Sequence, residues 1–238
     1  MIRLDKFLGT MEIGTRSQIK ELIKKGQVTL NGQICTQADC RIQEELDQVC
    51  VQGKRIFYEP LVYYMLNKPA GVVSATKDNL DRAVMDLLKG ASGKELFPVG
   101  RLDKDTEGLL IITNDGNLSH RLLSPKKHVP KTYYVKAACR ITEEMKRQLE
   151  QGVDIGEDKP SLPAKVRLLD ESSLELTITE GKFHQVKRML KAVGNEVIYL
   201  KRLSMGMVFL DEGLAPGEYR RLTPEEVLCL KKLVSPLK

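Results

Sequence analysis

A charged segment enclosed by two glycines leads directly into an apolar run near the middle of the chain. Three acidic and two basic side chains lie between Gly100 and Gly108. The apolar run at residues 109–113 is short and partly β-branched, as is typical of a buried strand, and the sequence Asn-Asp-Gly at 114–116 ends it. We therefore predict a charged turn held against a core strand, which is a favourable place for a positioned side chain.

Composition restricts the class of protein. The 238 residues are 42% apolar and 29% charged, as in soluble globular proteins. No apolar run approaches the roughly 18 residues of a membrane span, and the first residues lack the apolar region of a secretory signal. The five cysteines form no C-x-x-C pair, which argues against a disulfide framework or a zinc ribbon. We expect a cytoplasmic protein with reduced thiols, no metal and no membrane partner.

Apolar periodicity and turn residues predict an α+β protein. Helices are expected at 14–25, 80–89, 117–123 and 142–151, after the turn at 180–185 as far as residue 194, and from 224 to about 233. Strands are expected at 61–66, 109–113, 131–137, 164–169, 174–179, 197–200 and 207–210, and a hairpin with an Asn-Gly turn at 27–34. Pro60 suggests a boundary between domains at 1–58 and 61–238.

Positive charge is concentrated in two segments. Residues 1–26 contain six Lys and Arg against three Asp and Glu, whereas residues 27–58 contain three against four. Between residues 116 and 142 there is no acidic residue, and two adjacent tyrosines, Tyr133 and Tyr134, lie among the cations. With a net charge of +6, this pattern suits a nucleic acid, although a solvated helix and an ordinary strand would also explain it. Strand periodicity places the two tyrosines on opposite faces, so at most one serves a ligand.

The acidic turn allows two further interpretations. Residues 103–108 match the opening of an EF-hand calcium loop, but the twelfth position is Asn114 instead of Glu and the flanks resemble strands, which excludes calcium binding. Two of the three carboxylates (Asp103, Asp105 and Glu107) could also form a pair for glycoside cleavage. That interpretation leaves the basic segments unexplained.

Two stretches of motifs resemble known families. Residues 3–8, 15–18 and 22–32 resemble the S4 RNA-binding module, in a match that covers roughly residues 1–58. The motifs Leu-Asn-Lys-Pro-Ala-Gly at 66–71, Gly-Arg-Leu-Asp at 100–103, Lys-Thr-Tyr at 131–133 and His-Gln-Val-Lys-Arg-Met at 184–189 resemble the pseudouridine synthases, specifically the family of the small-subunit ribosomal enzyme. This resemblance implies an S4-like α/β domain followed by a catalytic domain with a mixed, largely antiparallel sheet flanked by helices.

The resemblance also implies the chemistry. Asp103 would be the catalytic aspartate, acting either as a nucleophile on the ribose or as a base that removes a ribose proton. Tyr133 would stack on the flipped uracil, Lys187 would pair with Asp103, and Arg101 would fill the gap left by the base. The reaction is an isomerisation without redox or hydrolysis, so no cofactor is expected.

The implied partner is ribosomal RNA, most directly that of the small subunit, and a monomer is expected. A large-subunit RNA target and a catalytically silent RNA-binding or ribosome-assembly protein are the alternatives. The candidate RNA contacts, besides Arg101, are Arg3, Lys6, Arg16, Lys20, Lys24, Lys126, Lys127, Lys131, His184, Gln185 and Arg188.

Overall fold

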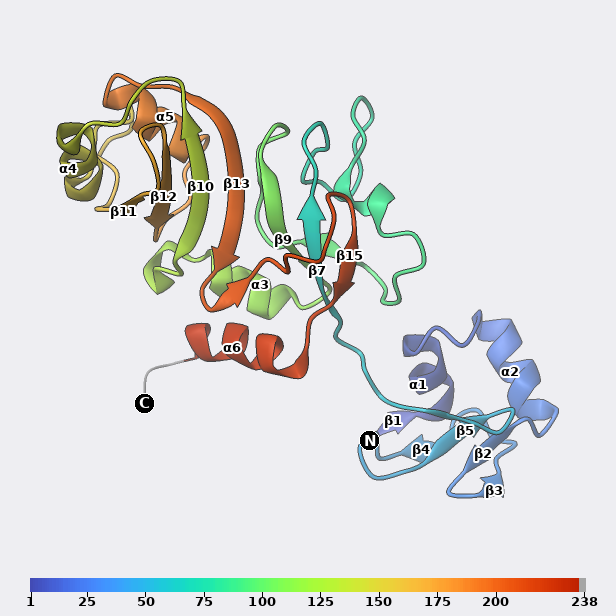
Figure 1. Ribbon diagram of the computed structural model, residues 1–238. Coiled ribbons are helices and arrows are strands. Elements are labelled where there is room, and N and C mark those ends of the chain that lie inside the picture. The colour runs from blue at the N-terminus through green and yellow to red at the C-terminus, as the bar shows by residue number, and fades with distance from the viewer. Residues whose placement is uncertain (236–238) are drawn as a thin grey trace. The chain divides into compact units, whose positions relative to one another are not determined.

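The computed structural model describes residues 1–235, which form two compact units (Figure 1). The smaller unit comprises Met1–Val62 together with Gly90–Glu95, and the larger comprises Tyr63–Lys89 together with residues 96–235. Each unit has a hydrophobic core of its own. The chain is therefore an α+β protein, as the sequence predicts.

The smaller unit packs two helices with short antiparallel strands. Its elements are β1 (Ile2–Arg3), α1 (Leu4–Thr10), α2 (Arg16–Lys24), β2 (Val28–Leu30), β3 (Gln33–Ile34), β4 (Arg41–Ile42), β5 (Val49–Val51) and β6 (Lys54–Ile56). Strands β3, β2, β5 and β6 form one sheet in that order, and β1 pairs with β4. The predicted hairpin is present, and Asn31 and Gly32 both have the positive φ angles that its tight turn requires.

Helix α2 shows how the sequence divides its two faces. Thr15 and Gln18 form a capping box at its start, where each side chain bonds to the other residue's backbone N–H. Ile19 and Ile23 are fully buried in the core beneath the helix. The basic residues Arg16, Lys20 and Lys24 are exposed on another face. The predicted amphipathic helix is confirmed, with its cations free to meet solvent or RNA.

The larger unit is built on one mixed sheet. Its strands are β7 (Tyr63–Lys68), β8 (Phe97–Pro98), β9 (Glu107–Thr113), β10 (Lys131–Ala137), β11 (Lys165–Leu168), β12 (Ser173–Ile178), β13 (Val197–Met205), β14 (Val208–Phe209) and β15 (Tyr219–Arg221). The order is β11-β12-β10-β13-β9-β7-β15, with β14 beside β13 and β8 beside β9. In the part of the chain that the structure describes, all strand pairs of this sheet are antiparallel except β9 with β13.

Helices cover the larger sheet, whose central strands β7 and β9 are buried on both faces. They are α3 (Gly116–Leu123), α4 (Glu143–Gln151), α5 (Gln185–Ala192) and α6 (Pro224–Val234), with short 3-10 helices η1 (Val84–Leu87) and η2 (Pro125–Lys127). Met65 of β7 and Leu109 and Ile111 of β9 pack in one cluster with helices α3 and α6. The helices contribute Leu118 and Leu230 to it. Helices α4 and α5 lie by the β10–β12 half (Figure 1). The strand that follows the acidic turn is therefore central and buried.

Two predicted elements differ from the structure. The segment 80–89, expected to be a helix, forms only the single turn η1. Hydrogen bonds to side chains and to the turn after β7 occupy the backbone groups that a longer helix would need. Asp78 accepts the amides of Leu80 and Asp81, Asp86 accepts that of Ala83, and Val73 exchanges backbone bonds with residues 82 and 84. Leu80, the first residue of the expected helix, is 96% exposed. The separate strand expected at 197–200 is the first half of β13, which continues to Met205.

Candidate active site

The acidic turn lies between β8 and β9, and its two glycines are required by different contacts. The amide of Thr106 donates to the Asp103 carbonyl (3.1 Å), closing the turn. Gly108 has φ +99°, and a Cβ there would overlap the carbonyl of Arg202 and lie 2.8 Å from its amide nitrogen. Gly100 has φ +76°, and a Cβ at this position would lie 2.8 Å from a methyl group of Leu123. These contacts let β9 approach β13 closely and fix where the turn begins and ends.

A buried lysine holds the turn from beneath. Lys68, at the end of β7, is 0% exposed, and its ammonium donates to the carbonyls of Pro69 (3.0 Å), Lys104 (3.2 Å) and Thr106 (2.8 Å). Burial lowers its pKa to about 8, although the nearby charges of Asp105 and Asp103 oppose that shift. No role for Lys68 was predicted from the motif that contains it. Its only signal was a cation that ends an apolar strand and precedes Pro69.

Lys187 is shared between two carboxylates. Its ammonium lies 3.5 Å from Asp103 Oδ2, and 2.5 and 2.8 Å from the two oxygens of Asp105. The hydrogen bond from Lys187 lowers the pKa of Asp105, despite some burial. Asp105 had no predicted role apart from the possible glycoside-cleaving pair, and the structure makes it the nearest partner of Lys187. Glu107 is also engaged, since its carboxylate accepts the Tyr199 hydroxyl at 2.6 Å.

The start of α5 carries His184 and Lys187 towards Asp103. His184 Nε2 lies 3.6 Å from Asp103 Oδ1, and the backbone of His184 is left-handed (φ +47°), which is uncommon for a residue other than glycine. Asp103 and both of its partners are partly exposed. The arrangement holds the Asp103 carboxylate between an ammonium group and an imidazole and aims it at the position of a bound ligand.

The side chains of Gln185 and Arg188 are both engaged within the protein, and a contact of either with RNA stays a prediction. Gln185 is buried, and its side chain bonds to Glu180 and to the amide of Lys182. The guanidinium of Arg188 contacts Glu157 (2.7 Å) and the carbonyls of residues 155 and 183. Arg188 therefore anchors a loop, while Lys187 faces the acidic turn.

Tyr133 is aligned with the acidic turn across the sheet. Its neighbour on β13 is Arg202, which lies opposite Gly108 on β9, so Tyr133 is two strands, or about 10 Å, from the end of the turn. Tyr133 is only 8% exposed, so a ligand could reach only a small part of its ring. The hydroxyl of Tyr134 donates to Ser173, and its ring meets Tyr199 edge-on.

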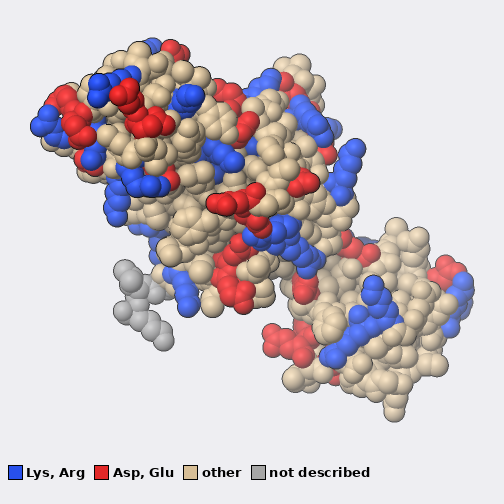
Figure 2. All heavy atoms as spheres, viewed as in Figure 1, with Lys and Arg blue, Asp and Glu red and all other residues tan. Residues whose placement is uncertain are grey.

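Most of the other expected RNA contacts are exposed, but Lys131 is not. Its ammonium is buried and donates to the Val129 carbonyl, and burial together with the nearby Arg202 lowers its pKa to about 8. Lys131 is therefore withdrawn as an RNA contact. In the view of Figure 2, acidic and basic side chains are interspersed over the larger unit, so charge alone does not locate an RNA path there. The exposed candidates are Arg3, Lys6, Arg16, Lys20, Lys24, Arg101, Lys126 and Lys127.

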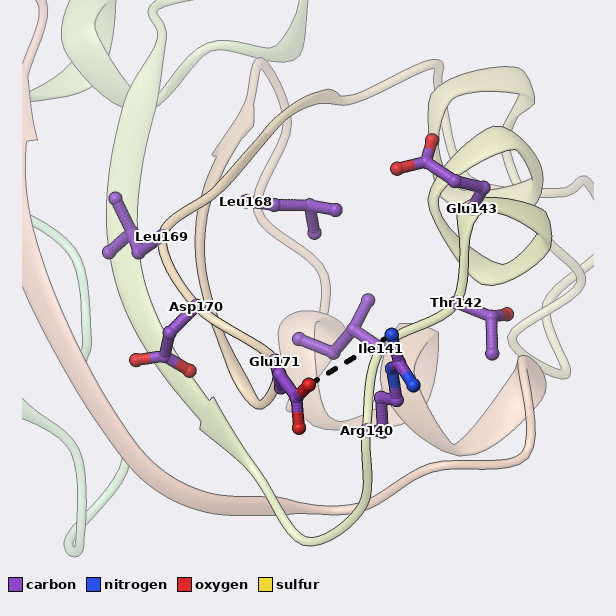
Figure 3. A pocket seen from close by; sticks show the side chains of 8 residues that line it. All are labelled: Arg140, Ile141, Thr142, Glu143, Leu168, Leu169, Asp170 and Glu171. Carbon is purple, nitrogen blue, oxygen red and sulfur yellow. Dashed lines mark ion pairs between the residues drawn. The ribbon is translucent and has the colours of Figure 1, made fainter.

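A hollow elsewhere on the larger unit contains none of the predicted site residues. It is lined by residues 140–143, between β10 and α4, and by residues 168–171, between β11 and β12 (Figure 3). An ion pair between Arg140 and Glu171 (3.9 Å) lies within it. Within residues 1–235, His, Cys, Asp and Glu side chains form no group of three or more that could hold a metal ion. Nor does that range contain a helix both long and apolar enough to span a membrane.

Comparisons with known proteins agree with these features. The model of the RNA pseudouridylate synthase family matches residues 62–192, and that of the S4 domain matches residues 2–49. A Bacillus subtilis protein named uncharacterized RNA pseudouridine synthase YtzG is 50% identical, covering 97% of this chain and 99% of that protein. Ribosomal small subunit pseudouridine synthase A of Vibrio cholerae is 42% identical over 97% of this chain and all of the relative.

Two further matches extend the comparison. Ribosomal large subunit pseudouridine synthase B of Bacillus subtilis is 40% identical over 98% of this chain and 97% of that protein. A crystal structure of a pseudouridylate synthase is 40% identical, has a TM-score of 0.69, and covers 97% of this chain and all of that one. The chain therefore belongs to the RNA pseudouridine synthases, isomerases that act on RNA, and carries an S4 domain at its N-terminal end.

Proposed function

We propose that this RNA pseudouridine synthase isomerises one uridine of small-subunit (16S) ribosomal RNA, with Asp103 acting on the ribose. The observation that carries the proposal is the position of the Asp103 carboxylate. It is partly exposed at the end of a rigid turn, 3.5 Å from the Lys187 ammonium and 3.6 Å from the His184 imidazole. A carboxylate held in this way is oriented to meet a sugar.

The proposed reaction conserves all atoms. The bond from N1 of uracil to C1′ of the ribose breaks, the ring turns, and a bond from C5 to C1′ forms. The proton on C5 is lost and N1 regains one, so product and substrate are isomers. Asp103 serves either as the nucleophile at C1′ or as the base towards a ribose proton, and both routes need its ionised form. Lys187, 3.5 Å away, is proposed to orient the carboxylate.

The other proposed roles concern the flipped nucleotide. A uridine within paired RNA must leave its stack, at a cost of a few kcal/mol. Arg101, exposed beside the turn, is proposed to fill the vacated space with its planar guanidinium. Tyr133, on β10 two strands from β9, is proposed to contact the uracil. Exposed cations of both units would offset the cost through phosphate contacts.

The RNA target is proposed from similarity. The Vibrio cholerae relative is named for the small ribosomal subunit, while the 40% identical Bacillus subtilis relative is named for the large one. Residues 62–75 and 124–135 resemble the small-subunit enzyme more than its large-subunit relatives, which favours the small-subunit target. We also propose that the protein acts as a monomer in the cytoplasm, where ribosomal subunits are made.

Deletion and complementation test both parts of the proposal. Cells lacking the protein should lose one pseudouridine from small-subunit ribosomal RNA, as mapped across both ribosomal RNAs. The wild-type gene should restore it, and a gene with Asp103→Asn should not, because an amide is neither an adequate nucleophile nor a base. The purified Asp103→Asn protein should bind the same RNA within a few fold of wild type.

The alternatives predict other outcomes. Loss of a pseudouridine from large-subunit RNA would refute the proposed target but keep the reaction. Restoration by the Asp103→Asn gene would refute the role of Asp103. Unchanged maps of both RNAs would refute a ribosomal RNA target and favour a protein that only binds RNA.

A further inference from the structure

An aromatic ring lies exposed beside the proposed site, and neither the sequence motifs nor the proposed mechanism uses it. Phe183, in the turn between β12 and α5, is 74% exposed. A single exposed apolar side chain is common on protein surfaces and needs no explanation by itself. The case for Phe183 rests on what the ring touches and on how its backbone is held.

The Phe183 ring is stacked on a residue that contacts Asp103. Its centroid lies 3.8 Å from that of the His184 ring, with an interplanar angle of 19°. His184 in turn lies 3.6 Å from the Asp103 carboxylate. Phe183 therefore forms the outer layer of a stack whose inner layer is next to the proposed catalytic group. Its other face is available, because most of the ring meets solvent.

The turn that presents Phe183 is rigid. The Phe183 carbonyl accepts a hydrogen bond from Arg188 (3.1 Å), and the amide of Gln185 donates to the Lys182 carbonyl (3.2 Å). The buried side chain of Gln185 accepts the Lys182 amide (2.9 Å) and donates to Glu180 (2.6 Å). His184 is held in a left-handed conformation, which surrounding contacts must enforce and which recurs at ligand clamps. A ring fixed in this way loses little entropy when a flat ligand stacks on it.

We infer that Phe183 is a stacking platform for an unpaired nucleobase next to the target uridine. The inference rests on the proposed function. Nucleobases stack on exposed aromatic rings in single-stranded RNA recognition, and the exposed ring of Phe183 lies within two residue contacts of Asp103. The base belongs to a neighbour of the target, because His184 already occupies the layer between Phe183 and Asp103.

Three variants of the full-length protein test the platform on a synthetic RNA hairpin that spans the modified uridine. Phe183→Ala should raise KM about tenfold or more, as expected for loss of one base stack, with the effect falling on KM rather than on kcat. Phe183→Trp should keep KM within about twofold, because indole also stacks. Phe209→Ala is the matched control, since Phe209 is 61% exposed on β14 of the same unit and should leave KM unchanged.

Removing the base from the RNA identifies the contact. We would prepare hairpins that each lack the base of one nucleotide, on one side of the target or the other. For one of these hairpins, wild type and Phe183→Ala should have equal KM values, because the base that stacks on Phe183 is missing. The stacking inference is overturned if Phe183→Ala and Phe209→Ala have the same KM on the intact hairpin, or if Phe183→Ala and Phe183→Trp lose kcat alike. Absence of pseudouridine formation by wild type would instead refute the proposed function, and the inference with it.

Discussion

At the scale of single residues, Lys68 and Asp103 act on the same turn, Lys68 from the core side and Asp103 from the exposed side. The ammonium of Lys68 binds three carbonyls, two of which belong to the turn that carries Asp103. A buried cation without a carboxylate in direct contact is costly, and here backbone dipoles compensate for the lost water. The turn is therefore fixed from the core side, leaving the carboxylates of Asp103 and Asp105 to face Lys187 from the outer side.

The shifted pKa of Lys68 gives a test by pH. In the folded protein it titrates at about 8, whereas in the unfolded chain it titrates near 10.5. Between these values the unfolded chain binds more protons, so the free energy of unfolding rises with pH. Relative to Lys68→Met, wild type should gain about 2 kcal/mol between pH 7 and pH 10 in urea denaturation. The exposed Lys127→Met should behave like wild type, and equal gains in all three proteins would contradict the assignment.

The sequence predicted residues whose roles follow from local motifs and missed those that depend on distant partners. The positions of Asp103 and Lys187 could be inferred from their motifs, and the structure brings the two side chains within 3.5 Å. The pairing of Asp105 with Lys187 spans 82 positions and depends on how α5 packs. The burial of Lys131 depends on β13, because a lysine in an alternating strand is normally exposed. Neither effect has a local signal.

At the scale of elements, the same division applies. The Asn-Gly hairpin at 27–34 and the capped helix α6 formed as predicted, because their signals act within a few residues. The helix expected at 80–89 failed, because Asp78 and Asp86 bind backbone amides and the segment pairs with the turn after β7. Its apolar residues Ala83 and Val84 are buried, although only the single 3-10 turn η1 forms there.

The contact between β9 and β13 gives a prediction at this scale. Gly108→Ala should lower the free energy of unfolding by more than about 2 kcal/mol. The alanine would have to keep a positive φ, and its Cβ would overlap the backbone of Arg202. Gly116→Ala is the control, because it lies in open space at the start of α3 and should be neutral or slightly stabilising. Urea denaturation of both variants provides the measurement, and similar stabilities would show that β9 can move away from β13.

At the scale of the whole molecule, the proposed chemistry lies in one unit, while the other unit carries a separate set of exposed cations. The proposed catalytic groups all lie in the larger unit, on the turn before β9, on β10 and at the start of α5. The smaller unit contains an S4 domain and presents exposed cations on α2. Binding through phosphates adds affinity without reading bases, so this unit should set how tightly RNA is held rather than how fast the reaction proceeds.

Substituting the cations of α2 should separate these two contributions. The triple variant Arg16→Gln, Lys20→Gln, Lys24→Gln should weaken RNA binding and reduce the slope of log affinity against log salt by about 2 to 3, because each lost phosphate contact removes about 0.7 to 0.9. Turnover at saturating RNA should stay within about twofold. The matched control neutralises the exposed cations Arg41, Lys54 and Arg55 of the same unit, with the same change in net charge. If both triple variants shift the slope equally, net charge and not the face of α2 governs binding, whereas a large loss of saturated turnover in the α2 variant alone would show that α2 takes part in positioning the substrate.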